Sequence, residues 1–250
     1  MYIPKKLRPF LNDQSCHTDQ LGMSSSHVLI CQDFVLKRNP KDILSHEEKS
    51  YTYLKDYINI PHVIVSHHSQ KYDYIIMSKI DGKMLIDPYF VSHPEEGVKV
   101  LARGIKQLWT IPIEDCPVHY RLSEKLKVAY QHLINHNYEI DPDVFKDPRF
   151  PNTKALYQWL KDHQPEEELV FTHGDYCLPN VFINNKHHIG FIDMDRSGIA
   201  CKWQDISLCV RSIIYNYGDH QKLIDLFFKE LGIEKHDQLI EYYILLDEFF

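Results

Sequence analysis

The sequence predicts an α+β protein of two lobes, a small β-rich lobe over residues 1–80 and a larger, mainly helical lobe over residues 81–250. Three observations lead to this prediction. Apolar runs of strand length come first, apolar residues at helical spacing dominate afterwards, and the turn Ile80-Asp81-Gly82 separates the two patterns. A chain of 250 residues is long enough to bury the core of one large domain or of two lobes. We place the hinge at about residues 77–82.

The first lobe is expected to contain a small sheet and one helix. The polar pair Gln32-Asp33 separates two strand-like runs and so suggests a hairpin. Apolar residues at helical spacing follow, and Pro61 ends that helix. The expected strands are residues 27–31, 34–37, 63–65 and 72–78, and the expected helix covers about residues 41–57.

The second lobe is expected to be helical, with a few short strands around its loops. Two apolar stripes at helical spacing predict helices around residues 98–108 and 122–133. The other expected helices are residues 153–161, 203–215, 221–231 and 238–249, and the expected strands are residues 169–172, 181–183 and 189–192.

Composition excludes several classes of protein. The formal net charge of −7 argues against a nucleic-acid partner, because such partners are held by cationic patches. No apolar run approaches the roughly 18 residues of a membrane span, and residues 1–10 lack the apolar region of a secretion signal. We therefore expect a cytoplasmic monomer or weak dimer with no membrane partner. The cysteines form no C-x-x-C pair and are expected to be buried or free thiols: Cys16, Cys31, Cys116, Cys177, Cys201 and Cys209.

The most informative segment is residues 173–180, called the Asp175 loop below, which is followed by Phe191-Ile192-Asp193. Its His-x-Asp-x-x-x-x-Asn spacing matches the catalytic loop of protein kinases, in which the aspartate accepts the proton of the acceptor hydroxyl. Because Mg²⁺ takes oxygen ligands, Asn180 and Asp193 are candidate metal ligands, and Asp175 is the candidate catalytic base. The alternative is a tight polar turn. The full spacing, the flanking strands and the second carboxylate favour phosphoryl transfer.

A kinase also needs a basic group on the nucleotide phosphates, positioned by a carboxylate on a helix. Lys37 ends an expected strand, and the helix after it carries Glu47 and Glu48. We favour Glu47, since Glu48 points to another side of the helix. A solvated lysine is the alternative. The chain has no G-x-G-x-x-G segment, and a serine-containing run that includes Ser24 precedes the first strand instead.

Several stretches resemble a known family: residues 165–175, 190–193, 196–198, 202–206, 209–213 and 242–250, and Gly22-Met23-Ser24. The family is the aminoglycoside 3'-phosphotransferases, bacterial antibiotic-resistance kinases with a protein-kinase-like fold. The resemblance covers most of the second lobe and is looser in the first. It implies transfer of the γ-phosphate of ATP, with Mg²⁺ as cofactor and GTP not excluded, to the 3'-hydroxyl of kanamycin- or neomycin-type aminoglycosides.

The resemblance also implies roles for individual residues. Asp175 is the implied catalytic base, and Asn180 and Asp193 are the implied Mg²⁺ ligands. An acidic wall near the C-terminus fits a substrate with several ammonium groups, and the acidic residues 139–143 resemble the family's flap. The implied nucleotide-binding residues are Ser24, Lys37, Glu47, Ser78 and Ile80, and the implied substrate-binding residues are Arg196, Asp247, Glu248 and Phe250.

Two alternatives stay open. Val35 stands where the family often has an aromatic residue, and Asp195 replaces a usual glycine, so a silent nucleotide-binding module is one alternative. A kinase of another small hydroxyl compound, such as a choline-like or sugar substrate, is the other. Asp205 and Arg211 are expected to form a structural ion pair beneath the site.

Overall fold

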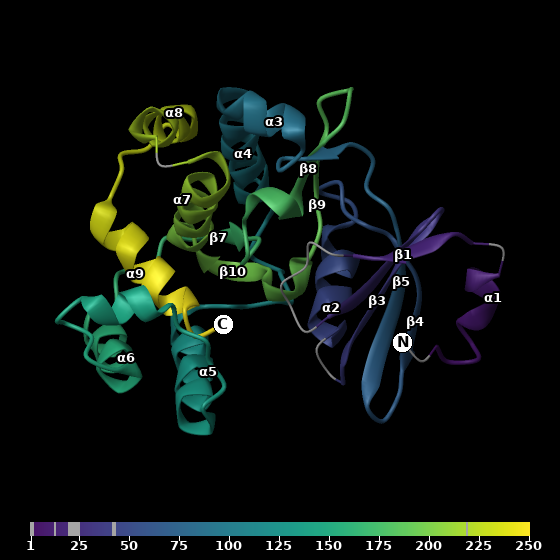
Figure 1. Ribbon diagram of the computed structural model, residues 1–250, viewed down its shortest axis with the longest axis horizontal. Coiled ribbons are helices and arrows are strands. Elements are labelled where there is room, and N and C mark those ends of the chain that lie inside the picture. The colour runs from purple at the N-terminus through teal and green to yellow at the C-terminus, as the bar shows by residue number, and fades with distance from the viewer. Residues whose placement is uncertain (1–2, 13, 20–25, 42–43, 219) are drawn as a thin grey trace. The chain divides into compact units, whose positions relative to one another are not determined.

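The computed structural model describes residues 3–12, 14–19, 26–41, 44–218 and 220–250 (Figure 1). The chain divides into two compact units. The first unit comprises Met1–Lys83 together with the returning segment Phe182–Arg196, and the second comprises Met84–Val181 and Ser197–Phe250.

The first unit is built on an antiparallel sheet whose described strands follow the order β1-β2-β3-β5-β4 (Figure 1). The hairpin expected around Gln32-Asp33 is confirmed, and the helix expected after it is α2, which ends at Leu54, earlier than expected. The expectation of one helix is wrong, because a four-residue helix, α1, precedes β1. The elements are α1 (Arg8–Leu11), β1 (Cys16–Thr18), β2 (His27–Cys31), β3 (Phe34–Pro40), α2 (Leu44–Leu54), β4 (Val63–His68) and β5 (Tyr72–Ser78).

Strand β3 lies in the middle of this sheet and sends alternate side chains to opposite faces. Leu36 packs with Leu7 and Ile76 in an apolar cluster on one face. Its neighbour Lys37 therefore lies on the other face, where it contacts Glu47 of α2 and is only 5% exposed. The alternation thus places the lysine on the face opposite the apolar cluster.

The returning segment supplies β8 (Val181–Ile183), β9 (Ile189–Phe191) and the 3-10 turn η3 (Met194–Arg196), which packs against α2. With β6 (Lys83–Met84) the strands follow the order β6-β8-β9. Gly190 lets β9 pass close to Asn59 and Ile80, because a Cβ at this position would lie 2.7 Å from both Asn59 Nδ2 and Ile80 Cγ2 and one of them would have to shift. The segment before Asp193 therefore lies close against these residues of the first unit.

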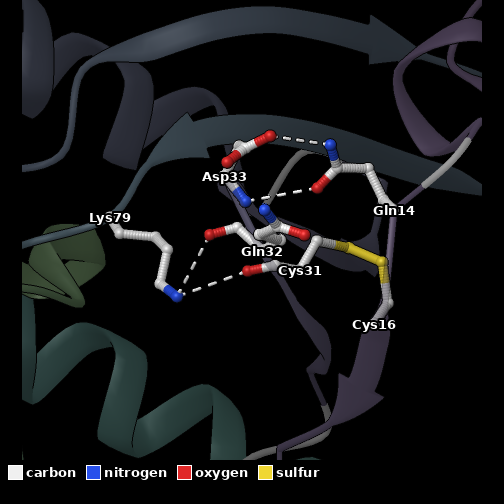
Figure 2. The surroundings of a disulfide bond; sticks show 6 residues. All are labelled: Gln14, Cys16, Cys31, Gln32, Asp33 and Lys79. Carbon is white, nitrogen blue, oxygen red and sulfur yellow. Dashed lines mark hydrogen bonds between the residues drawn. A yellow bond between two sulfur atoms is a disulfide. The ribbon is translucent and has the colours of Figure 1, made fainter.

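Two of the cysteines correct a prediction. Cys16 and Cys31 form a disulfide, so the expectation of thiols throughout is wrong for this pair (Figure 2). The physical reason is strand register: β1 pairs antiparallel with β2 so that Cys16 lies directly opposite Cys31. The carbonyl of Cys31 also accepts a hydrogen bond from Lys79 Nζ at 3.3 Å. The described cysteines outside this pair form no disulfide: Cys116, Cys177, Cys201 and Cys209.

The second unit is mainly helical. Helix α4 packs against α8, α7 against α9, and α6 against both α5 and α9 (Figure 1). The apolar stripe predicted for α4 is confirmed, since Val98, Leu101, Ile105 and Leu108 are fully buried. The helices are α3 (Pro88–Ser92), α4 (Pro94–Trp109), α5 (Leu122–Asn135), α6 (Thr153–Asp162), α7 (Trp203–Tyr217), α8 (Gln221–Leu231) and α9 (Asp237–Asp247), with 3-10 turns η1 (Pro142–Lys146) and η2 (Leu178–Asn180).

A two-stranded antiparallel ribbon accompanies these helices, made of β7 (Leu169–Thr172) and β10 (Gly198–Cys201). Strand β7 leads directly into the Asp175 loop, and β10 leads into α7. The ribbon therefore sets where the Asp175 loop begins relative to α7. Across the described residues, no helix is both long and apolar enough to cross a membrane.

Candidate active site

In the first unit, the buried Lys37 is the centre of a polar group that we call the lysine cluster: Lys37, the buried Glu47 and Tyr51, and the partly exposed Asp193. Lys37 Nζ donates to Glu47 Oε2 at 3.0 Å and to Asp193 Oδ1 at 2.5 Å. Tyr51, one helical turn after Glu47 on α2, donates its hydroxyl to Glu47 Oε1 at 2.9 Å. Both oxygens of the buried Glu47 carboxylate are therefore hydrogen-bonded.

Burial and mutual attraction act against each other in the lysine cluster. Burial disfavours the charged form of Lys37, but attraction to Glu47, Asp193 and Asp195 outweighs it, so the pKa of Lys37 is raised. Burial raises the pKa of Glu47 to about 7, against the opposing pull of Lys37. Lys37 therefore stays cationic.

Asp193 reaches the lysine cluster through an unusual backbone conformation. It follows β9 with φ of 63°, in the left-handed region that asparagine and aspartate tolerate better than most residues. η3 begins at the next residue and packs against α2. Such strain is typical of functional sites, and here it accompanies the contact between Asp193 and Lys37.

In the second unit, side chains of α7 accept hydrogen bonds from the backbone of the Asp175 loop. The buried carboxylate of Asp205 accepts the backbone N–H of His173 at 2.7 Å and of Gly174 at 2.9 Å. Two helical turns later, Ser212 Oγ accepts the N–H of Leu178 at 3.0 Å. Burial raises the pKa of Asp205, against the lowering effect of the nearby His173 and these hydrogen bonds. Sequence reasoning missed this role of Asp205.

Asp175 and Asn180 meet within the loop. Asn180 Nδ2 donates to the Asp175 carbonyl at 3.0 Å and to Asp175 Oδ2 at 3.1 Å. Tyr176 is fully buried and donates its hydroxyl to the Leu101 carbonyl on α4 at 2.8 Å, which anchors the loop. The loop thus presents one partly buried carboxylate whose orientation is fixed by an amide five residues later.

The acidic C-terminal residues Asp247 and Glu248 are both engaged by the second unit. Arg211 on α7 pairs with Asp247 at 2.5 Å, so the expected pair of Arg211 with Asp205 is wrong: α9 packs on α7 and brings Asp247 to the guanidinium. Glu248 Oε2 accepts the N–H of Asp141 at 2.8 Å, from the acidic segment 139–143. Burial raises the pKa of Glu248, although this N–H and Arg211 act in the opposite direction.

The remaining predicted site residues lie at or near the ends of elements. Ser78 Oγ accepts the N–H of His62 at 2.8 Å, at the end of β5 just before Ile80. Arg196 ends η3 in the first unit, and the Phe250 ring packs edge-on against His132 in the second. Ser24 lies outside the described residues. Among the described residues, no three or more His, Cys, Asp or Glu side chains gather as a metal site.

Comparisons with known proteins define the class of protein to which the chain belongs. A model of the phosphotransferase enzyme family matches residues 20–231. The solved structure of a type VIII aminoglycoside-3'-phosphotransferase superimposes with a TM-score of 0.82, at 19% identity, over 98% of this chain and 97% of its own. Another, aminoglycoside phosphotransferase APH(3'')-Id from Streptomyces rimosus with ADP and streptomycin, gives 0.79 at 20% identity, over 97% and 95%. The predicted α+β, protein-kinase-like fold with a β-rich and a helical lobe is confirmed.

A relative that aligns over its full length identifies the family more narrowly. An aminoglycoside 3'-phosphotransferase from Enterococcus faecalis is 34% identical, over 100% of this chain and 99% of its own length. The chain belongs to the aminoglycoside 3'-phosphotransferase family.

Proposed function

We propose that this chain transfers the γ-phosphate of ATP to the 3'-hydroxyl of kanamycin- or neomycin-type aminoglycosides. The observation that carries the proposal is the pairing of Asp175 with Asn180 in a loop that α7 binds. The chain around this loop is similar over its full length to the Enterococcus faecalis aminoglycoside 3'-phosphotransferase. ATP is a cytoplasmic nucleotide, so the reaction belongs in the cytoplasm.

Asp175 acts as the catalytic base. Its carboxylate accepts the proton of the acceptor hydroxyl while the hydroxyl oxygen forms a bond to the γ-phosphorus, and the bond from that phosphorus to the β,γ-bridging oxygen breaks to release ADP. The transfer asks little covalent chemistry of the protein, so positioning and electrostatics dominate. The Asn180 amide supports this role by fixing one carboxylate oxygen.

Asn180 and Asp193 are the proposed magnesium ligands. Their donor set fits, because Mg²⁺ is bound through few protein oxygens together with substrate phosphates. The two hydrogen bonds that the Asn180 side chain makes to described residues both use Nδ2, so Oδ1 is the atom proposed to bind a cation. When bound, Mg²⁺ neutralises charge on the phosphates. Lys37, positioned by Glu47, binds the same phosphates, and Ser24, Ser78 and Ile80 complete the nucleotide site.

The acceptor site is proposed to be the acidic C-terminal end: Asp247, Glu248 and the carboxylate of Phe250, with Arg196. Aminoglycosides carry several ammonium groups, which carboxylates attract from a distance and then fix through charge-assisted hydrogen bonds. The net charge of −7 is consistent with a cationic substrate.

A coupled ADP-release assay tests the function, with ATP and GTP in parallel and kanamycin, choline and a neutral sugar as acceptors. We expect ADP release that depends on kanamycin. Release with kanamycin no faster than without an acceptor contradicts the proposal, and faster release with choline or the sugar favours the other kinase alternative.

Deleting Phe250 separates these substrate classes further. We expect the KM for kanamycin to rise about tenfold, because a charge-assisted contact is lost. The KM for ATP should stay the same, which serves as the internal control. A kanamycin KM unaffected by the deletion removes Phe250 from the acceptor site.

A further inference from the structure

Helix α7 connects two parts of the second unit that the proposed reaction uses. Asp205 and Ser212 hold the Asp175 loop, and Arg211, next to Ser212, pairs with Asp247 at the end of α9. Because α9 also packs along α7, one helix sets the position of the proposed base and of a proposed substrate-binding carboxylate.

Arg211 is a cation among carboxylates. Its side chain is 40% exposed, whereas that of its partner Asp247 is 10% exposed. Burial disfavours its charged form, yet attraction to Asp247, Glu248 and Asp175 more than compensates and raises the pKa of Arg211. The guanidinium is therefore charged at every physiological pH, and it offsets part of the negative charge that a cationic acceptor meets.

A substrate with several ammonium groups can bind a strongly anionic surface in several orientations. Only one of them presents the 3'-hydroxyl to Asp175. An acceptor bound tightly in the wrong orientation reduces kcat and KM together, since it occupies the enzyme without reacting. An internal cation that occupies one carboxylate removes some of these unproductive arrangements.

We propose that Arg211 is a positioning residue that holds Asp247 against α7 and competes with substrate ammonium groups, so that the acceptor binds in its reactive orientation. The inference rests on the proposed function and goes beyond it by assigning acceptor orientation to a residue outside the acidic C-terminal end.

Steady-state kinetics of Arg211→Gln with kanamycin test the proposal. We expect kcat and the kanamycin KM both to fall about tenfold, with the KM for ATP within about twofold of wild type. The kanamycin KM should also depend more steeply on salt, because the surface has lost a positive charge. Arg211→Lys keeps the charge without the planar fork, and we expect only about a threefold fall in kcat with no rise in KM.

Arg149→Gln is the matched control. Arg149 pairs with Asp147 and with Glu241, which lies on α9 like Asp247, and its side chain is 42% exposed. Because neither partner is a proposed site residue, its loss should leave the kinetics unchanged. Thermal unfolding of both glutamine variants shows whether each is folded. If Arg211→Gln does not fold, the test uses Arg211→Lys, whose kcat should fall about threefold relative to the Arg149→Gln control with no rise in the kanamycin KM.

A raised kanamycin KM at unchanged kcat, or kinetics equal to those of Arg149→Gln, overturns the positioning role and leaves the proposed function intact. Wild-type protein that releases no ADP in the presence of kanamycin overturns the proposed function, and this inference falls with it. The two failures are thus distinguished by the wild-type rate.

Discussion

The lysine cluster of the first unit and the Asp175 loop of the second are stabilised in different ways. In the lysine cluster, buried charges satisfy one another: Lys37 contacts Glu47 and Asp193, and a tyrosine caps Glu47. In the Asp175 loop, backbone N–H groups are bound by α7, and the Asp175 carboxylate accepts a hydrogen bond from the Asn180 amide.

Because of this difference, residues of the lysine cluster are expected to contribute to stability as well as to function, whereas Asp175 is expected to contribute to turnover alone. Removing Lys37 or Glu47 breaks the buried ion pair between them and leaves a buried charge without that partner, which costs stability as well as function. Among the described residues, the carboxylate of Asp175 accepts its side-chain hydrogen bond from Asn180, and its pull on Arg211 adds to the larger effect of Asp247. It can therefore be removed at little structural cost. Mutations in the two regions should therefore differ in whether they affect folding or only turnover.

The largest effect on activity is expected for Asp175→Ala. Loss of the proposed base should reduce kcat about 10³-fold or more, within the range of general-base effects. Isothermal titration should show Mg²⁺-ATP still binding within a few-fold of wild type, because the lysine cluster is unchanged. A variant that keeps near-full turnover removes Asp175 from its assigned role.

Lys37→Met is expected to affect stability and nucleotide binding together. The substitution leaves Glu47 and Asp193 without their shared cation, so urea unfolding should show a loss of about 3 kcal/mol, and the KM for ATP should rise about tenfold or more. Lys202→Met is the matched control, because its pair with Glu168 lies at the surface and should contribute about 1 kcal/mol or less. Equal losses in the two variants contradict the comparison.

Tyr51→Phe is expected to have the smallest effect. It removes the hydroxyl on Glu47 and leaves a buried carboxylate oxygen without a donor, which should cost about 1 kcal/mol and raise the KM for ATP about threefold. Tyr57→Phe, just beyond α2 and 46% exposed, is the control and should change neither quantity. A Tyr51 variant indistinguishable from it shows that Glu47 needs no support from the tyrosine.

The sequence was informative where the signal is local. The helical stripe of α4 and the hairpin of β2 and β3 each depend on residues within a few positions, and both appear in the structure. The spacing of Asp175 and Asn180 is likewise local, and the two side chains meet. Local patterns therefore predicted the elements and the loop that holds the candidate base.

Partners distant in the chain were not predicted. Arg211 was expected to pair with Asp205, six positions earlier on one helix, but the packing of α9 gives it Asp247 instead. The disulfide depends on β1, a three-residue strand too short to carry a periodic signal. Asp205 binds backbone groups, which no side-chain pattern reveals. In each case the deciding interaction is tertiary.

The most direct test of the central claim compares two acceptors that differ by one oxygen: an aminoglycoside of the kanamycin type and its 3'-deoxy analogue, each incubated with the protein and Mg²⁺-ATP. We expect ADP release and a 3'-phosphate, located by ³¹P nuclear magnetic resonance, with the first acceptor, and no transfer to the second, although it still binds. Equal phosphorylation of both acceptors contradicts transfer to the 3'-hydroxyl.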